Sequence, residues 1–187
     1  MNHTTMIIIH PKDRTTTMLC ALYQGIEARR ITQDASSMEI RHTLNLSPGT
    51  ERIMLLGHGC PDGLYSRTDD TVEYFDRLII SHHHAYPLRR HGSNLIGIWC
   101  HADQFARKER LHGLFSGMII TELNEAEEHG IATTQEELTR ENELLFTRLR
   151  HLLDTDTPLR EVPESIAMLD EVHSPLTRFN YANFHFI

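Results

Sequence analysis

The stretch RIMLLGHGC, residues 52–60, contains an apolar run that ends at the sequence Gly-His-Gly-Cys. A short continuous apolar run is typical of a strand buried on both faces of a parallel sheet. The stretch NLIGIWCHA, residues 94–102, repeats the pattern and places Cys100 at the end of its own apolar run. Ligands bind at the carboxyl ends of the strands in an open parallel sheet, so we expect His58 and Cys100 to face one crevice.

Further apolar runs and helical patterns alternate along the rest of the chain. This alternation predicts an α/β fold, a three-layer α/β/α sandwich with a mainly parallel sheet. The expected strands are Met6–His10, 27–32, Ile53–Leu56, Leu78–Ile80, Leu95–Trp99 and Met118–Thr121. The expected helices are Arg14–Gly25, Ser36 or Ser37 to Leu46, Ser81–Arg90 and 101–113.

A capping-box pattern within Thr133–Glu137 predicts the start of the longest amphipathic helix. The apolar stripe of that helix contains Leu138, Leu145, Leu149 and Leu152. We expect one domain over residues 1–187, because this length is sufficient for one substantial core and short for two. Residues 154–187 form its C-terminal extension, and their aromatic end, FNYANFHFI, is expected to pack back on the domain.

Composition limits the classes of function. The chain of 187 residues carries a net charge of -8, which disfavours a nucleic-acid partner. Its three cysteines, Cys20, Cys60 and Cys100, lie far apart in sequence and do not resemble a secreted disulfide framework. The N-terminal apolar run Met6–Ile9 is too short for a signal peptide or a membrane span. These features predict a cytoplasmic protein with reduced thiols and no membrane partner.

The two strand-end motifs resemble those of the caspase-like (clan CD) cysteine peptidases. In that family an apolar strand ends in His-Gly, and a later apolar strand ends in Cys. His58 and Cys100 are 42 residues apart, near the spacing of about 50 found in caspases. The stretches GMIIT and NELLFTRLRHLL are similar to the strand and helix that follow the nucleophile, so the resemblance covers roughly residues 5–153. It implies a caspase-like fold.

The resemblance further implies a cysteine endopeptidase that hydrolyses a protein or peptide substrate without a cofactor or metal. Cys100 would be the nucleophile and His58 the general acid or base. Gly59 would lend its backbone N–H, with that of Cys100, to an oxyanion hole. A thiolate is a strong nucleophile, and an imidazole can protonate the leaving amine near neutral pH.

Acidic residues near the nucleophile strand predict the substrate pocket. Asp103, Glu122 and Glu125 follow that strand or the next, where the resemblance places the pocket. Such a carboxylate would select Lys or Arg before the cleaved bond through charge-assisted hydrogen bonds. Arg67, Arg89 and Arg90 would instead suit an acidic substrate, and the sequence leaves both options open.

Two alternatives belong to other classes. One is a catalytically silent interaction module with the caspase fold, because a fold does not guarantee an activity. The other is a zinc site formed by His58, Cys60, Cys100 and His101, which supply the nitrogens and sulfurs of structural zinc. Adjacent residues in an extended strand end point to opposite faces, which disfavours one shared tetrahedron. The run His82–His84 is equally unsuited to a shared metal, since neighbours on a helix point apart.

Cys60 raises a separate hypothesis. It lies two residues past His58, so the loop after Gly59 could bring it near Cys100. A disulfide between these thiols needs Cα atoms within about 7 Å and would silence the enzyme reversibly.

Overall fold

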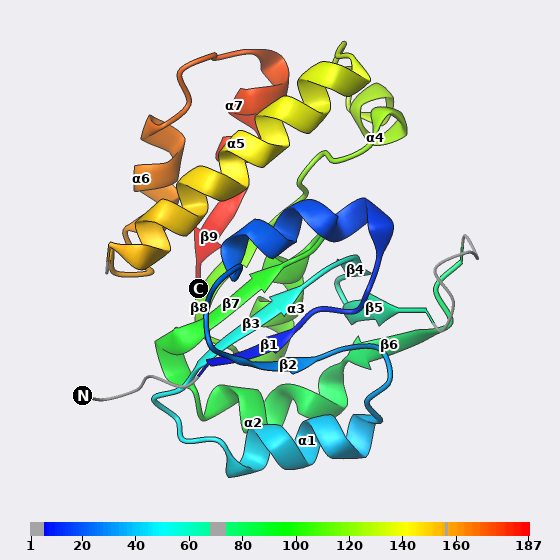
Figure 1. The fold of residues 1–187 in the computed structure, drawn as a ribbon, viewed down its shortest axis with the longest axis vertical. Coiled ribbons are helices and arrows are strands. Elements are labelled where there is room, and N and C mark those ends of the chain that lie inside the picture. The colour runs from blue at the N-terminus through cyan, green and yellow to red at the C-terminus, as the bar shows by residue number, and fades with distance from the viewer. Residues whose placement is uncertain (1–5, 68–73, 156) are drawn as a thin grey trace.

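The chain folds around a sheet built from short apolar strands (Figure 1). The computed structural model describes residues 6–67, 74–155 and 157–187. Within these ranges the main sheet has six strands, five mutually parallel and the last antiparallel. In spatial order they are β2 (Arg29–Ile31), β1 (Met6–Ile9), β3 (Arg52–Leu56), β7 (Leu95–Ile98), β8 (Gly113–Ser116) and β9 (Phe184–Phe186).

The side chains of β1 show why both faces of the sheet need cover. Met6 and Ile8 belong to one apolar cluster, whereas Ile7 and Ile9 belong to another. Successive side chains of a strand point to opposite faces, so each cluster marks one face. All four residues of β1 are buried, as are all four of β7. The predicted mainly parallel sheet of continuous apolar strands is confirmed.

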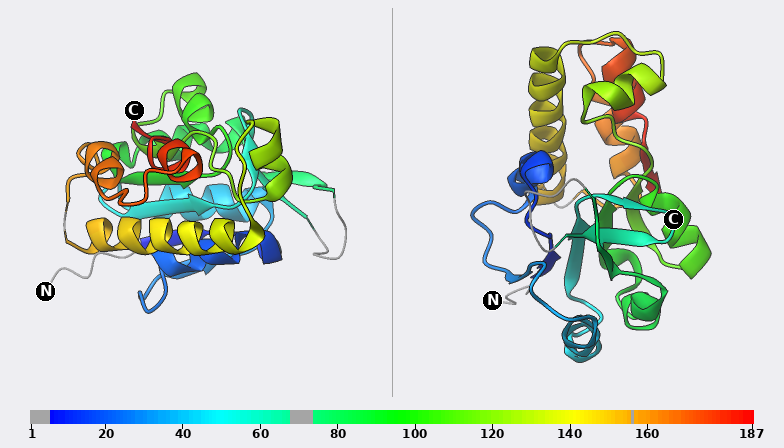
Figure 2. Two further views of the ribbon diagram at one scale, coloured as in Figure 1. Left: turned by 90° about the horizontal axis from the view of Figure 1, so that it is seen from above. Right: turned by 90° about the vertical axis from the view of Figure 1, so that its right-hand side faces the viewer.

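Helices cover the two faces of the sheet (Figures 1 and 2). In the described ranges, none of them has both the length and the apolar character that crossing a membrane requires. One face carries the 3-10 helix η1 (Arg14–Leu22), α5 (Gln135–Asp154), α6 (Val162–Met168) and α7 (Pro175–Tyr181). The other carries α1 (Ser37–Leu46), α2 (Ala85–Arg89) and α3 (Ala102–Glu109). Short connections contain η2 (His82–His84), η3 (Gly92–Asn94) and α4 (Leu123–Glu128).

The long amphipathic helix α5 forms as expected. Thr134 is its N-cap, and the Thr134 hydroxyl accepts a hydrogen bond from the Glu137 amide at 3.2 Å. The Glu137 carboxylate accepts from the Thr133 hydroxyl at 3.0 Å, so only half of the expected capping box forms. Each buried leucine of the helix contributes about 1.5–3 kcal/mol to folding. The buried leucines are Leu138, Leu145, Leu149 and Leu153.

A small antiparallel sheet follows β3 directly. Its strands are β4 (Gly59–Cys60), β5 (Gly63–Ser66) and β6 (Arg77–Ile80). The strand expected at Leu78–Ile80 therefore forms, but it pairs with β5 rather than joining the main sheet. Since only two residues, Gly57 and His58, separate β3 from β4, this sheet lies beside the strand end that carries His58.

The strand expected at Met118–Thr121 is wrong, and β8 lies earlier in the chain. Arg110 adopts a left-handed conformation (φ 55°) and ends α3 before Gly113. Gly113 begins β8, where a Cβ atom would collide with the Leu95 carbonyl of β7. The run Met118–Thr121 keeps two buried isoleucines, but the Ile120 amide and carbonyl bond to asparagine side chains instead of a neighbouring strand.

The C-terminal segment packs against the rest of the chain. Tyr181 and Phe184 belong to the apolar cluster that contains α5 and one face of the sheet. β9 pairs with β8, and the Ile187 amide donates to the Gly113 carbonyl at 3.0 Å. The aromatic end of the chain thus forms the edge of the main sheet.

Candidate active site

Strand register places His58 and Cys100 next to each other at the carboxyl ends of two central strands. Leu56 of β3 is the register partner of Ile98 in β7, and the Gly57 amide donates to the Ile98 carbonyl at 3.1 Å. His58 and Cys100 each follow two residues beyond these partners, at the carboxyl ends of adjacent parallel strands. Both residues line the same cavity. The expectation that they share a crevice therefore agrees with the structure.

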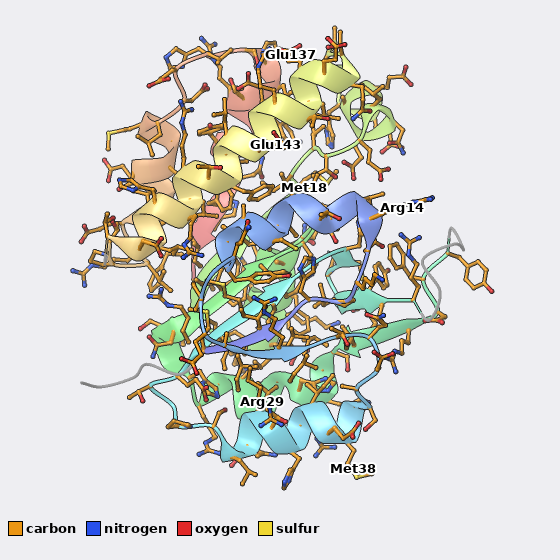
Figure 3. All side chains as sticks on the ribbon, in the orientation of Figure 1. Arg14, Met18, Arg29, Met38, Glu137 and Glu143 are labelled. Carbon is orange, nitrogen blue, oxygen red and sulfur yellow. The ribbon has the colours of Figure 1, made fainter. Side chains whose placement is uncertain are left out.

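The cavity between them is small and apolar. Its volume is about 30 Å³, which is enough for one or two water molecules. Met18 of η1 and Phe146 of α5 form the walls that come from the helices packed on this face of the sheet (Figure 3 labels Met18). A substrate side chain needs more room, and the flexible thioether of Met18 is the wall best able to move.

Thr15 fixes which nitrogen of His58 carries a proton. The Thr15 hydroxyl lies 2.6 Å from His58 Nε2 and donates its own proton to Asp13 Oδ1 at 2.7 Å. A hydroxyl has one proton to donate, so its contact with His58 requires Nε2–H as the donor. The neutral ring then carries its lone pair on Nδ1, which becomes the nitrogen able to accept a proton.

Asp13 is a buried carboxylate at the end of this chain of hydrogen bonds. Its side chain is 5% exposed and forms an ion pair with Arg67. Burial raises the pKa of Asp13, but hydrogen bonds from Thr15 and the charges of His58 and Arg67 outweigh it, so the pKa lies below its usual value. Asp13 Oδ1 is 3.8 Å from His58 Nε2. A buried, negatively charged carboxylate therefore lies close to the His58 ring.

Aromatic packing holds the other side of the His58 ring. Its centroid lies 5.2 Å from that of Phe75, and Phe75 stacks on Tyr65 of β5 at 5.1 Å. The guanidinium of Arg67 lies over the same Phe75 ring, 5.2 Å from its centroid. The loop and small sheet after β3 thus position the imidazole together with Thr15.

Cys100 sits in a sharp turn between β7 and α3. The next residue, His101, is left-handed with φ 68° and precedes the helix. Burial raises the pKa of the Cys100 thiol to about 12, and the charges of Glu125 and Glu122 raise it further, against hydrogen bonds from the amides of Ile119 and of Cys100 itself. At neutral pH the sulfur is therefore a protonated thiol.

Two asparagines hold the segment that contacts this thiol. The Ile120 amide donates to Asn180 Oδ1 at 2.8 Å, and the Ile120 carbonyl accepts from Asn180 and Asn142 at 2.9 and 3.0 Å. Both asparagines are buried. Because Ile119 precedes Ile120, this network fixes the amide that bonds to Cys100. Asn142 lies on α5 and Asn180 on α7, so the C-terminal helices position one side of the site.

The expected acidic residues lie in or next to two short helices, α3 and α4. Glu125 Oε2 accepts hydrogen bonds from the Thr121 amide at 2.7 Å and the Glu122 amide at 3.0 Å at the start of α4. The charges of Glu125 and Glu122 both act on Cys100. Asp103 lies in the first turn of α3, and the lining of the cavity does not include it. None of the three expected carboxylates lines the cavity beside Cys100, although Glu122 and Glu125 act on its thiol through their charges.

Gly59 directs its amide away from the small sheet. The Tyr65 amide donates to the His58 carbonyl at 2.7 Å, and Gly59 pairs with Leu64 one step further along. Hydrogen-bonded and non-hydrogen-bonded pairs alternate in an antiparallel ladder, so the Gly59 N–H points away from β5. A Cβ atom at Gly59 would collide with the Trp99 ring, which explains the glycine on packing grounds alone.

The groups proposed for zinc do not converge. Within the described residues, no three His, Cys, Asp or Glu side chains are arranged to hold a metal ion. Cys60 Sγ accepts from the Asp62 amide at 3.3 Å, and the His101 ring contacts Gln104 at 3.2 Å. Cys60 also lies outside the lining of the cavity beside Cys100, so nothing in these contacts favours the disulfide hypothesis.

The remaining candidates take part in structural contacts. His82 bonds to the buried Glu109, whose backbone carbonyl accepts from Arg89. Arg90 donates to the Asn45 carbonyl at 2.7 Å. Arg67 is paired with Asp13. None of the three arginines considered for an acidic substrate lines the cavity beside Cys100.

Sequence reasoning missed four residues that surround the dyad: Asp13, Thr15, Asn142 and Asn180. The signal for the first two was a polar stretch, PKDRTTT, directly after a buried strand. A comparison of the chain with protein-family models, curated proteins and solved structures found no match. The chemistry of the site is therefore argued from its geometry.

Proposed function

We propose that the chain is a caspase-like cysteine endopeptidase in which residues 1–187 form one domain. Cys100 is the nucleophile, and His58 is the general acid and base. The observation that carries this proposal is that His58 and Cys100 lie at equivalent positions, two residues beyond the last register partners of β3 and β7, and line one cavity. A cysteine and a histidine on one cavity, with the histidine oriented by further groups, supply the residue types that nucleophilic catalysis needs.

The hydrogen bonds around His58 define the proton transfers. The Cys100 thiol gives its proton to Nδ1 of His58 as the sulfur bonds to the substrate carbonyl carbon. The Nε2–H group keeps its hydrogen bond to the Thr15 hydroxyl, and Asp13 stabilises the imidazolium that results. The imidazolium then protonates the amine nitrogen as the carbon–nitrogen bond breaks. Water then attacks the thioester carbonyl carbon and passes a proton to His58. The carbon–sulfur bond breaks, the carboxylic acid product leaves, and the imidazolium returns the proton to the sulfur.

We assign the amides of Gly59 and Cys100 to the tetrahedral oxygen. The Gly59 N–H points away from its own small sheet. The Cys100 N–H lies at the end of β7, beside the sulfur that attacks. Donors placed in advance toward a developing oxyanion supply much of the rate enhancement in acyl transfer.

Glu122 and Glu125 give the proposal a substrate class. Their charges act on Cys100, so a cationic side chain bound next to the thiol would lie near both. We assign Lys or Arg to the residue before the cleaved bond. A bound cation would also offset the two charges that raise the pKa of the thiol, so the correct substrate would ease its deprotonation.

A second candidate is an interaction module with this fold and no turnover. The observations that favour it are the Cys100 pKa of about 12 and the cavity of about 30 Å³. A thiol so rarely ionised in a site so small is a weak nucleophile until substrate or another event opens the site.

Cleavage of a peptide library by the purified protein tests the proposal. We expect products that end in Lys or Arg, and we expect Cys100→Ala and His58→Ala to abolish them. Cys60→Ala and His82→Ala are matched controls, because each removes the same residue type outside the cavity, and both should retain activity. Cleavage that survives Cys100→Ala would refute the mechanism. No cleavage by the native protein, while Cys100 still binds a peptide aldehyde, would favour the silent module.

Thr15→Val tests the orientation of the ring. Valine has nearly the same shape as threonine but cannot accept the Nε2 proton, so we expect kcat to fall about tenfold or more with little change in KM. A control is Thr17→Val, which removes a hydroxyl from the same helix that bonds only to backbone carbonyls. Equal losses in both variants would assign Thr15 a merely structural role.

A further inference from the structure

A second, larger cavity lies at the carboxyl ends of β1 and β2. Its volume is about 360 Å³, and its walls come from β1, β2, η1 and the turn after β1. It shares no lining residue with the cavity beside Cys100. The two cavities are therefore distinct, although Asp13 lines this one and also lies beside His58. The second cavity lies at the carboxyl ends of the strands, where open parallel sheets bind ligands. Its size is within the range of small-molecule sites, about 300–1,000 Å³.

The interior of this cavity does not require a polar ligand. Apolar walls come from Ile8, Pro11 and Ile31. The polar groups inside satisfy one another, since Tyr23 Oη lies 2.9 Å from His10 Nδ1 and 3.1 Å from Cys20 Sγ. An apolar body can therefore enter without leaving buried polar groups unpaired.

The charged groups of the lining are of mainly one sign. Lys12 and Arg30 both line the cavity, and Arg30 lies over the Tyr23 ring, 5.0 Å from its centroid. Among the described residues, neither cation takes part in an ion pair with a carboxylate. The carboxylate of Asp13 also lines the cavity, but Arg67 and Thr15 already neutralise and hydrogen-bond it. The lining thus offers two cations that form no ion pair with a described carboxylate.

We propose that this cavity binds a small organic anion with an apolar body, whose carboxylate pairs with Arg30 and Lys12 while its hydrocarbon contacts Ile8 and Ile31. Arginine and a carboxylate form paired, charge-assisted hydrogen bonds, which give the head group its specificity. The hydrocarbon supplies affinity by removing apolar surface from water. The proposal stands independently of the peptidase activity.

Three probes with one chain length separate the head group from the tail. Sodium octanoate, 1-octanol and octylamine are titrated into the full chain by calorimetry at pH 7.5 and low salt. We expect octanoate to bind, 1-octanol to bind at least tenfold more weakly, and octylamine to show no saturable binding. Equal binding of octanoate and 1-octanol would overturn the assignment of an anion, and no octanoate binding would overturn the site.

Neighbouring arginines of β2 provide a matched pair of variants. Arg30 lines the cavity, whereas Arg29 does not (Figure 3 labels Arg29). We expect Arg30→Gln to weaken octanoate at least tenfold, and Arg29→Gln to change it less than twofold. Equal weakening by both would show a general surface charge effect and overturn the proposal.

A cavity-filling variant and a mapping experiment locate the ligand. Thr17→Phe places a ring in the cavity and should abolish octanoate binding, while an unchanged far-ultraviolet spectrum shows that the protein is folded. In the native protein, octanoate should shift the methyl resonances of Ile8 and Ile31 but not that of Ile79, which lies on β6. Shifts confined to other isoleucines would place the octanoate elsewhere and refute the site.

Discussion

Acidification should destabilise this protein through one buried histidine. His10 follows β1, with Nδ1 2.9 Å from the Tyr23 hydroxyl and Nε2 3.1 Å from the Thr16 hydroxyl. Burial lowers the pKa of His10 from 6.5 to about 4; the charge of Asp13 opposes this shift and that of His58 adds to it. Protonation of the ring in the folded state would place a second proton where both nitrogens already have neutral partners.

The direction of the effect follows from the two pKa values. The unfolded chain takes up a proton at His10 near pH 6.5, whereas the folded chain resists until about pH 4. The stabilisation is therefore fully present above pH 6.5 and is lost as the pH falls toward 4. Across this interval the loss amounts to about 3 kcal/mol of unfolding free energy. That is a large part of the stability of a typical domain, about 5–15 kcal/mol.

The assay is urea unfolding, followed by circular dichroism at several pH values between 7.5 and 4. His10→Gln keeps an amide that can bond to Tyr23 and Thr16 but cannot titrate. We expect the native protein to lose about 3 kcal/mol more than His10→Gln over this range. His84, whose pKa burial also lowers, contributes equally to both proteins. Parallel curves for the two proteins would refute the reasoning.

Three further predictions concern the core, the turn beside His58 and the thiol. Leu145→Ala should lower the unfolding free energy by about 2–5 kcal/mol. Leu144→Ala should lower it far less, because Leu144 is 39% exposed. Equal losses of unfolding free energy in urea would contradict the assigned helix face. Gly59→Ala should cost about 1–3 kcal/mol because its methyl group meets the Trp99 ring, and an unchanged denaturation midpoint would show that this contact is not tight. Iodoacetamide should label Cys100 at a rate that keeps rising up to pH 10, since its pKa is about 12; a plateau near neutral pH, measured by mass spectrometry, would contradict the burial of the thiol.

The features that were predictable from sequence rest on local patterns. Apolar runs such as Ile53–Leu56 have no polar alternation, and that pattern is found where both faces of a strand are buried. The placement of His58 and Cys100 needed one more assumption, that their strands are neighbours, and the β3–β7 pairing agrees with it. Helix α5 was predictable because its period and N-cap both lie within one continuous stretch.

The features that were missed depend on contacts between distant segments. Met118–Thr121 is as apolar as a strand, but Asn142 and Asn180 bond to its backbone from two later helices. The Asp13–Thr15–His58 contacts join residues 43 positions apart through a turn whose geometry no local pattern specifies. Asp103 was placed correctly on a helix, yet the direction in which that helix leaves β7 takes it away from the cavity lining.

The asparagine tether beside Cys100 has a consequence for partial unfolding. Sixty residues separate Ile120 from Asn180, so closing this contact costs more loop entropy than pairing β7 with β8. Detachment of α7 would release the Ile119 amide from the sulfur while the central strands stay paired. Amide exchange at Ile120 should therefore proceed through an opening of lower free energy than exchange within β3 and β7. Cys100 would sample a second, more open environment at a free energy below that of global unfolding.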